Sequence, residues 1–180
     1  MPLGGTITLD FPTMLSTFRC VVRSLTQHGF KRIFILNGHG GNTTPLDVIV
    51  TELTIEFKIP LAYATYWGIG EKRIAALLDR QKALLHACEA ETSMIMAMAP
   101  ELVNPDELSQ MHGPYIPGLS AIPTVNEGVY RWRQLSSRSP IGVIGDATTA
   151  SAEKGEKLLA AISADVAEAL VNDRLWSEPI

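Results

Sequence analysis

Cysteine is scarce in this sequence, with two residues among 180, Cys20 and Cys88. Both lie in segments whose pattern predicts regular structure, so we expect reduced thiols rather than a disulfide framework. The first ten residues lack a basic stretch followed by an apolar one, so no secretory signal is predicted. The longest apolar run, Met94 to Pro100, is far shorter than the roughly 18 residues that a membrane span needs. We therefore expect a soluble, cytoplasmic protein.

An excess of charge of one sign is also missing. Fifteen basic and nineteen acidic side chains give a net charge of −4, and no Lys/Arg cluster favours nucleic acid or an anionic membrane as a partner. Apolar residues make up 46% and charged residues 19% of the chain, which is typical of a folded globular protein. A chain of this length suits one domain, and we expect residues 1–180 to form it.

Helical and strand-like patterns alternate along the first third of the chain. Asp10 followed by Pro12 predicts the start of a helix, and His28-Gly29 predicts its end. The apolar run 33–36 predicts a strand buried on both faces; a Gly-rich turn and a second helix follow, and then 61–65 predicts another strand. This alternation predicts an α/β fold, with a parallel sheet that carries helices on both faces.

The rest of the chain has weaker patterns and shows no domain boundary. Helices are predicted over 71–85 and 89–99, and an amphipathic helix over 150–175. Residues 104–140, which are rich in proline and glycine, predict a long excursion of loops. Residues 141–145 predict a short strand.

His39 is the first candidate for chemistry, because it stands in a turn between a predicted strand and a helix. Open α/β sheets bind ligands beyond the carboxyl ends of their strands, and Gly38, Gly40 and Gly41 would let the backbone approach a ligand closely. Two other interpretations stay open. The histidine could simply face solvent, or the turn could cradle a phosphate at the helix N-terminus, although the sequence contains neither the dinucleotide fingerprint nor the Walker A pattern.

The second candidate region is residues 86–93. Glu91 shares a predicted helix face with three apolar residues, and a carboxylate on such a face must be paired or bound to a metal. Glu89 lies roughly 200° around the helix from Glu91, and its attraction to the helix N-terminus would explain it alone. His86 precedes the helix. Together with Cys88 it could form a thiol nucleophile, but the sequence marks no third, orienting residue.

Three further positions are weaker candidates. Tyr66 and Trp67 follow a predicted strand and could wall a small planar substrate, although core packing explains such a pair equally well. His112 lies in the loop-rich stretch, where most histidines are exposed and idle. Asp146 is expected to stabilise a turn or cap a helix.

The sequence resembles the creatininase (creatinine amidohydrolase) family. The resemblance rests on motifs that occur in the family's order and spacing: Gly5-Thr-Ile-Thr-Leu9, Asn37-Gly-His-Gly-Gly-Asn42, His86-Ala-Cys-Glu-Ala-Glu-Thr-Ser93, and Gly142-Val-Ile-Gly-Asp146 with Ala152-Glu-Lys-Gly155. It implies a three-layer α/β/α sandwich with a mostly parallel sheet, usually assembled as a hexamer. It also implies hydrolysis of a C–N bond in a cyclic or linear amide at a binuclear zinc or manganese site, where the metals polarise the carbonyl and generate hydroxide.

The resemblance also implies roles for individual residues. His39 and Glu91 match metal ligands, and His86 matches a histidine that assists the tetrahedral intermediate and the leaving nitrogen. Glu89 matches a group that either supports the ligands or transfers a proton. The positions that match the lining of the substrate pocket are Tyr66, Trp67, Gly40 and Gly41.

The chain also departs from the family pattern. Family members carry a first strand, a Glu-x-His motif and an Asp before the region that matches Gly5, and these supply most metal ligands; we expect the chain to lack this N-terminal segment. Creatininase itself has a glutamate ligand at the position of Gly41, and the family usually has glycine at Cys88. Because His39 and Glu91 alone cannot hold two metals, a non-catalytic scaffold or oligomer subunit is the alternative to a metal-dependent amidohydrolase.

Overall fold

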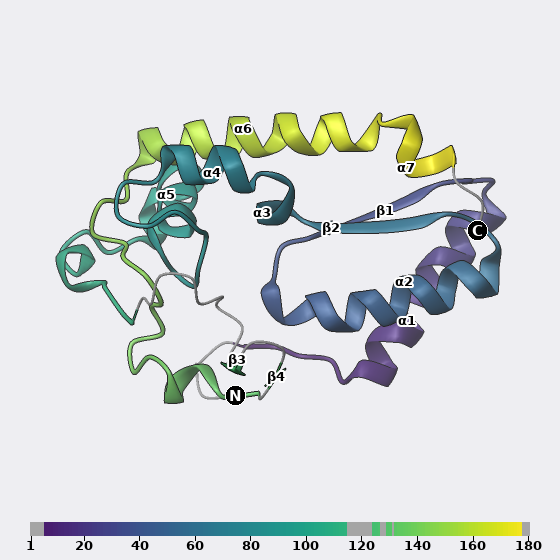
Figure 1. Cartoon of the computed structure of the whole chain (residues 1–180), viewed down its shortest axis with the longest axis horizontal. Coiled ribbons are helices and arrows are strands. Elements are labelled where there is room, and N and C mark those ends of the chain that lie inside the picture. Colours follow the sequence, from purple (N-terminus) through teal and green to yellow (C-terminus); the bar gives the residue numbers. More distant parts are fainter. Residues whose placement is uncertain (1–5, 115–123, 127–128, 131, 178–180) are drawn as a thin grey trace. The chain divides into compact units, whose positions relative to one another are not determined.

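The computed structural model describes residues 6–114, 124–126, 129–130 and 132–177 (Figure 1). The chain forms two compact units. Unit 1 comprises Met1–Thr6 and Gly70–Ser163, and unit 2 comprises Ile7–Ile69 and Ala164–Ile180. None of the described helices is both long and apolar enough to cross a bilayer.

Unit 2 contains the predicted alternation of helices and parallel strands. The elements of its N-terminal segment, in chain order, are α1 (Phe11–Gln27), β1 (Ile33–Asn37), the 3₁₀ turn η1 (Gly40–Asn42), α2 (Thr43–Phe57), β2 (Leu61–Thr65) and α3 (Tyr66–Ile69). The end of α6 (Ala152–Leu170) and α7 (Asp173–Ser177) also belong to this unit. Strands β1 and β2 pair in parallel, with Ile33 opposite Leu61 and Asn37 opposite Thr65. The two strands therefore end at the same edge, where η1 and α3 begin.

Local signals set the ends of α1. The Asp10 carboxylate accepts a hydrogen bond of 2.7 Å from the Thr13 amide, and so satisfies one of the N–H groups that a helix start leaves unpaired. Gly29 follows the helix at φ +86°, a left-handed conformation that suits glycine. Both predicted ends of this helix are confirmed.

The core of unit 2 lies between the two long helices and one face of the strand pair. Its buried members are Val22 of α1, Leu46, Ile49 and Leu53 of α2, and Ile33 and Leu61 of the strands. Strand residues alternate between faces, so Leu36 points away from this core and is 52% exposed. The prediction that the first strand is buried on both faces is therefore wrong at this residue.

Unit 1 has less regular structure than unit 2. Its longer elements are α4 (Glu71–Leu77), α5 (Glu89–Met98) and the first part of α6 (Ala152–Leu170). The 3₁₀ turns η2 (Pro100–Leu102), η3 (Leu108–Gln110) and η4 (Leu135–Ser137) and the antiparallel strands β3 (Thr124–Asn126) and β4 (Val129–Tyr130) lie in the stretch predicted to be loops. Much of residues 115–131 is outside the described part of the chain.

Three predicted elements differ from the structure. The helix expected over 71–85 ends at Leu77, because the amides of Asp79 and Arg80 donate to the Glu89 carboxylate instead of continuing the helical ladder. Residues 141–145 form no strand among the described elements. Gly142 and Gly145 there have positive φ values, and Ile144 pairs with His86 through an isolated bridge.

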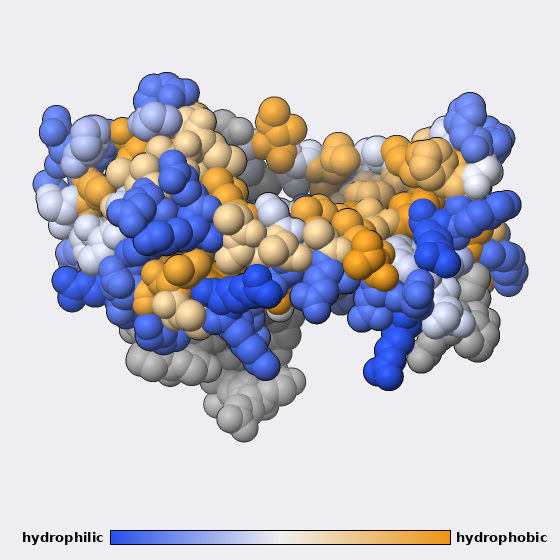
Figure 2. Space-filling model, turned by 90° about the horizontal axis from the view of Figure 1, so that it is seen from above, coloured by the Kyte–Doolittle hydropathy of each residue, from blue (hydrophilic) through white to orange (hydrophobic). Residues whose placement is uncertain are grey.

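The helix expected over 150–175 is two helices. α6 ends at Leu170, and α7 (Asp173–Ser177) starts after Asn172, whose side chain accepts a hydrogen bond from the Arg174 amide. Asparagine favours such local caps over continuing a helix. Figure 2 views the face along α6 and shows hydrophobic residues lying among hydrophilic ones. Val171, directly after α6, is 79% exposed.

Candidate active site

In unit 2, the side chain of Asn37 fixes the turn that carries His39. Asn37 is 3% exposed at the end of β1. Its Oδ1 accepts from the His39 amide at 3.1 Å, and its Nδ2 donates to the His39 carbonyl at 2.9 Å and to Thr65 Oγ1, at the end of β2, at 3.0 Å. One buried amide therefore joins both strand ends to the turn, while His39 itself is exposed.

The glycines of this turn accommodate two rings. A Cβ atom on Gly41 would lie 2.7 Å from His39 Nε2, so the imidazole packs directly over this residue. A Cβ atom on Gly40 would lie 3.7 Å from the Trp67 indole, which in turn meets Tyr66 edge to face with ring centroids 4.9 Å apart. The structure thus brings His39 together with all four residues predicted to line a substrate pocket.

In unit 1, His86 is held from both its ring and its backbone. Its Nδ1 lies 2.6 Å from the carbonyl oxygen of Gly142, and its own carbonyl accepts from the Ile144 amide at 2.8 Å. A carbonyl can only accept, so Nδ1 carries the proton, and in the neutral imidazole Nε2 has the lone pair. The half-buried ring therefore presents one defined tautomer.

Glu91 fixes the residue next to His86. Its Oε2 accepts a hydrogen bond of 2.5 Å from the Ala87 amide. Ala87 has φ +49°, in the left-handed region that residues other than glycine rarely adopt, and Thr92 Oγ1 donates to its carbonyl at 3.4 Å. The first turn of α5 therefore holds the chain in the unusual conformation that places His86.

Glu89 is fully buried, and the structure surrounds its carboxylate with donors. The Asp79 amide donates to both oxygens, at 3.0 and 3.1 Å, and the Arg80 amide donates to Oε2 at 3.2 Å. Lys154 of α6 forms an ion pair with Oε1. Attraction to the helix N-terminus is therefore not the full explanation of Glu89, because its main partners lie outside α5.

Lys154, the ion-pair partner of Glu89 in unit 1, is a residue to which no sequence pattern assigns a role. Its ammonium also donates to Asp79 Oδ2 at 2.9 Å and to the Thr149 carbonyl at 2.8 Å. Burial lowers the pKa of Lys154, but the hydrogen bonds to Glu89 and Asp79 outweigh burial and raise it above its usual value. The same ammonium holds the pKa of Asp79 below its usual value. Its position in the motif of residues 152–155 was the available signal.

Gly155, the next residue of that motif, sets the approach of α6 to α5. A Cβ atom here would lie 2.0 Å from the carbonyl oxygen of Ser93. Ser93 is fully buried, and its Oγ accepts from the Ser151 amide at 3.1 Å just before α6 begins. The two helices can therefore come this close only with glycine at this position.

Gln81 is a buried polar residue that no pattern in the sequence singles out. It is 2% exposed, and its Oε1 accepts from the Asp146 amide at 2.8 Å. Asp146 itself accepts from the amide and hydroxyl of Thr148, at 2.7 and 2.5 Å, which confirms its predicted role in a turn. Gly145 has φ +101°, a conformation that L side chains rarely adopt, so glycine is favoured in this turn.

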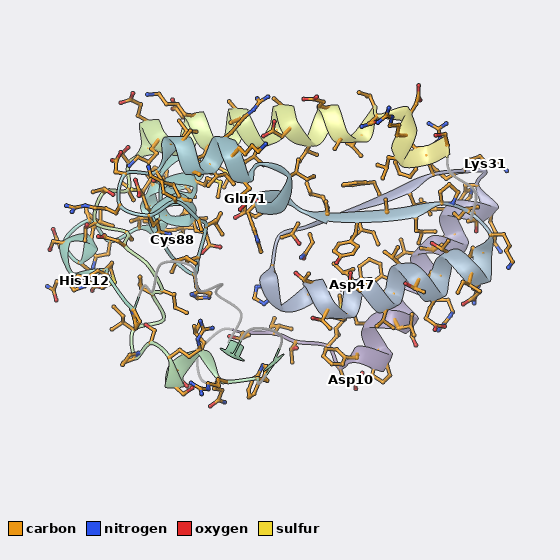
Figure 3. The ribbon with its side chains drawn as sticks, viewed as in Figure 1. Asp10, Lys31, Asp47, Glu71, Cys88 and His112 are labelled. Carbon is orange, nitrogen blue, oxygen red and sulfur yellow. The ribbon has the colours of Figure 1, made fainter. Side chains whose placement is uncertain are left out.

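Cys88 does not have the surroundings of a nucleophile. Figure 3 shows Cys88 inside unit 1 and His112 on its outside. The thiol is fully buried and accepts a hydrogen bond of 3.3 Å from the Leu85 amide, and burial raises its pKa. Because the thiolate is the reactive form, the buried site does not favour a thiol nucleophile. Cys20 is exposed, and both cysteines are free, as predicted.

The predicted metal ligands come from different units, His39 from unit 2 and Glu91 from unit 1. Imidazole nitrogen and carboxylate oxygen are donors that zinc and manganese accept. Within the described residues, no group of three or more His, Cys, Asp or Glu side chains is placed to hold a metal ion. Since catalytic zinc takes three protein ligands, these residues by themselves do not make a complete metal centre.

Comparison with known proteins shows consistent similarity to one family. The family model Creatininase, described as creatinine amidohydrolase, matches residues 1–170. The creatinine amidohydrolase of Pseudomonas putida is 27% identical over 180 residues, which are 92% of this chain and 65% of that protein. The mycofactocin precursor peptide peptidase of Mycobacterium ulcerans (strain Agy99) is 33% identical over 129 residues, which are 72% of this chain and 44% of that protein.

Solved structures agree with the sequence comparisons. A manganese form of creatininase superposes with a TM-score of 0.69 at 25% identity, and a mutant creatininase of Zn-Zn type with a TM-score of 0.70 at 24% identity. Each match covers 95% of this chain and 67% of the other. The chain thus spans less than two thirds of the length of these two curated relatives. The family model and the solved structures match nearly all of the chain. The predicted resemblance and the α/β fold class are confirmed, and the chain belongs to the creatininase family.

Proposed function

We propose that this chain is a metal-dependent amidohydrolase that cleaves the C–N bond of a small cyclic or linear amide. Family membership and the similarity to a creatinine amidohydrolase support the reaction class. The observation that carries the proposal is the fixed tautomer of His86, whose Nδ1 donates to the Gly142 carbonyl at 2.6 Å.

Amide hydrolysis needs a group that moves one proton. Water must lose a proton as its oxygen bonds to the carbonyl carbon, and the nitrogen must gain one as the C–N bond breaks. The hydrogen bond to the Gly142 carbonyl keeps the proton on Nδ1. The lone pair on His86 Nε2 therefore accepts the first proton, and Nε2 then returns it to the leaving nitrogen. Glu91 supports this role, since its hydrogen bond to Ala87 holds the residue beside His86.

We assign the ligands that this chain supplies for zinc or manganese to His39 and Glu91. The manganese and Zn-Zn forms of creatininase support this choice of metals. Tyr66, Trp67, Gly40 and Gly41 are proposed to line the substrate pocket, because Trp67 lies over Gly40 beside the His39 turn. A cytoplasmic homo-oligomer, a hexamer by family resemblance, completes the proposal.

The first experiment measures metal content and turnover on the purified chain. Metal is quantified by mass spectrometry after exhaustive dialysis for the wild type, His39→Ala, Glu91→Ala and the control His28→Ala, which alters an exposed histidine at the end of α1. Turnover of creatinine, of formamides and of a short peptide is then assayed with zinc or manganese. We expect both ligand variants alone to lose metal, and His86→Ala to lower kcat by about 10² to 10⁴.

A non-catalytic member of the family is the second candidate. The observation that favours it is that the described residues bring together no group of three metal donors. It predicts no retained zinc or manganese and no turnover with any of the three substrate classes. Retained metal that His39→Ala and Glu91→Ala remove, with turnover that His86→Ala abolishes, would exclude it.

A further inference from the structure

The Glu89–Lys154 pair is the most deeply buried ionic contact among the described ion pairs. The side chain of Glu89 is completely buried and that of Lys154 is 13% exposed. A buried charge is costly unless it is paired and hydrogen-bonded. Both charges of this pair have such partners. The carboxylate receives two backbone amides besides the ammonium, and the ammonium reaches Asp79 and the Thr149 carbonyl as well.

The pair joins three segments that are distant in sequence. Glu89 is the first residue of α5, its amide donors lie in the loop after α4, and Lys154 lies in the first turn of α6, 65 residues further along the chain. Gly155 adds a close backbone contact between the same two helices at Ser93. The N-terminal half of α5 is therefore held both by an ion pair, at Glu89, and by a close backbone contact, at Ser93.

The same turn of α5 carries the groups proposed for catalysis. Glu89 lies three residues after His86 and two before Glu91, and between them Ala87 has φ +49°. That conformation persists only where its surroundings determine it. The Glu91 carboxylate reaches back to the Ala87 amide only if the first turn of α5 begins where Glu89 anchors it.

We propose that Glu89 and Lys154 are positioning residues: their ion pair fixes the first turn of α5 so that Glu91 holds Ala87 and His86 keeps its bond to Gly142. This assignment selects the supporting role for Glu89 over proton transfer, because its carboxylate is enclosed by protein donors. Only the expected effect of this positioning role on kcat rests on the proposed function. The geometry it describes belongs to the chain with or without turnover.

The test compares Lys154→Met, Lys154→Arg and Glu89→Gln with a matched control. Lys157→Met alters an ion pair on the same helix, between Lys157 and Glu153, whose side chains are 58% and 77% exposed. Two signals are followed by NMR on the chain without added metal: hydrogen exchange of the Ala87 amide, and the ¹⁵N shifts of the His86 ring, which report the proton on Nδ1. Melting temperature is recorded in parallel.

We expect Lys154→Met and Glu89→Gln each to speed exchange at Ala87 at least tenfold and to mix the two His86 tautomers. Lys154→Arg keeps the charge, so both signals should stay at their wild-type values. Lys157→Met should also leave them unchanged. For the active enzyme, kcat should fall about 10- to 100-fold in the first two variants with little change in KM, the range seen when a group supporting an active-site residue is removed.

Unchanged Ala87 exchange and His86 shifts in either folded variant would overturn the proposal, even if the melting temperature fell. Glu89→Gln has nearly the size of the original side chain, so it provides the measurement if Lys154→Met does not fold. Turnover that survives His86→Ala would remove the proposed function, while the NMR signals would still decide the positioning role.

Discussion

Gly41 and Gly38 lie in the same turn, but only one of them faces the imidazole of His39. A Cβ atom on Gly41 would lie 2.7 Å from Nε2, whereas among the described residues nothing comes within 4 Å of a Cβ atom on Gly38. We expect Gly41→Ala to displace the ring, since it is the mobile end of a side chain, and to weaken zinc binding about tenfold. Stability should stay level or rise by up to about 1 kcal/mol, because alanine restricts the unfolded chain.

Gly38→Ala is the matched control for that change. It should give the same small gain in stability in a urea titration, with unchanged zinc affinity in calorimetry and an unchanged His39 ring signal by NMR. Equal zinc affinities for Gly41→Ala and Gly38→Ala would show that the packing of the ring over Gly41 does not matter for metal binding.

Tyr63 links strand β2 to α2, and it gives the stability a dependence on alkaline pH. Burial, with a hydrogen bond of 2.5 Å to Asp47 on the strand-facing side of α2 (Figure 3), raises the pKa of Tyr63 from 10.0 to about 12. Between these values the unfolded chain loses a proton that the folded chain keeps, so unfolding releases a proton and stability falls as pH rises. The contribution is fully present below about pH 10.

Urea midpoints at pH 7, 9, 10 and 11 would measure this effect for the wild type and Tyr63→Phe. Lysines also titrate in this range, so the difference between the two proteins is the quantity that isolates Tyr63. We expect the free energy of unfolding of the wild type, relative to that of Tyr63→Phe, to decrease progressively as the pH rises above about 10. A difference that stays constant over this range would contradict the expected proton release.

At the scale of elements, the contact between α5 and α6 leaves no room for a side chain at Gly155. A methyl group at Gly155 would lie 2.0 Å from the backbone oxygen of Ser93, which has no rotamer to move away. We expect Gly155→Ala to lower the free energy of unfolding by about 1–3 kcal/mol or more, although alanine is the better helix former. Ser163→Ala, at an exposed position of the same helix, should be neutral or slightly stabilising, and a Gly155→Ala protein as stable as wild type would refute the close contact.

The elements that the sequence predicts correctly are those whose signals are local. The apolar spacing of α1, α2 and α5 depends on neighbours within a turn or two, and so do the caps of α1 and the short apolar runs of β1 and β2. The helix expected to reach residue 85 ends at Leu77 because Glu89, ten residues beyond Asp79, takes the amides that would have continued it. Apolar periodicity carries no information about such a distant partner.

The same distinction between local signals and distant partners applies to the candidate site. The motifs identify His39, His86 and Glu91 as residues of interest, and the structure adds what surrounds them. The burial of Glu89 depends on a lysine 65 residues away, and the packing of Trp67 on Gly40 depends on the register that aligns the ends of β1 and β2. Periodicity within one segment predicts neither, and the roles of these residues in metal and substrate binding stay predictions.

At the scale of the whole molecule, each unit contains a completely buried leucine on one of its long helices. Leu53 of α2 is 0% exposed in the core of unit 2, and Leu158 of α6 is 0% exposed in unit 1. Truncating a buried leucine removes apolar contact and leaves a cavity. We expect Leu53→Ala and Leu158→Ala each to lower the free energy of unfolding by about 2–5 kcal/mol, measured by urea titration.

Hydrogen exchange read by mass spectrometry would locate each loss. In Leu53→Ala the peptides that cover β1, α2 and β2 should exchange faster than in the wild type, because Leu53 packs with Ile33 and Leu61 of these strands. In Leu158→Ala the acceleration should centre on α5 and the first turns of α6. The control Leu175→Ala, at a position 39% exposed in α7, should cost less than either. If Leu53→Ala left exchange in β1 and β2 unchanged while opening α5, the assignment of Leu53 to the core of unit 2 would be wrong.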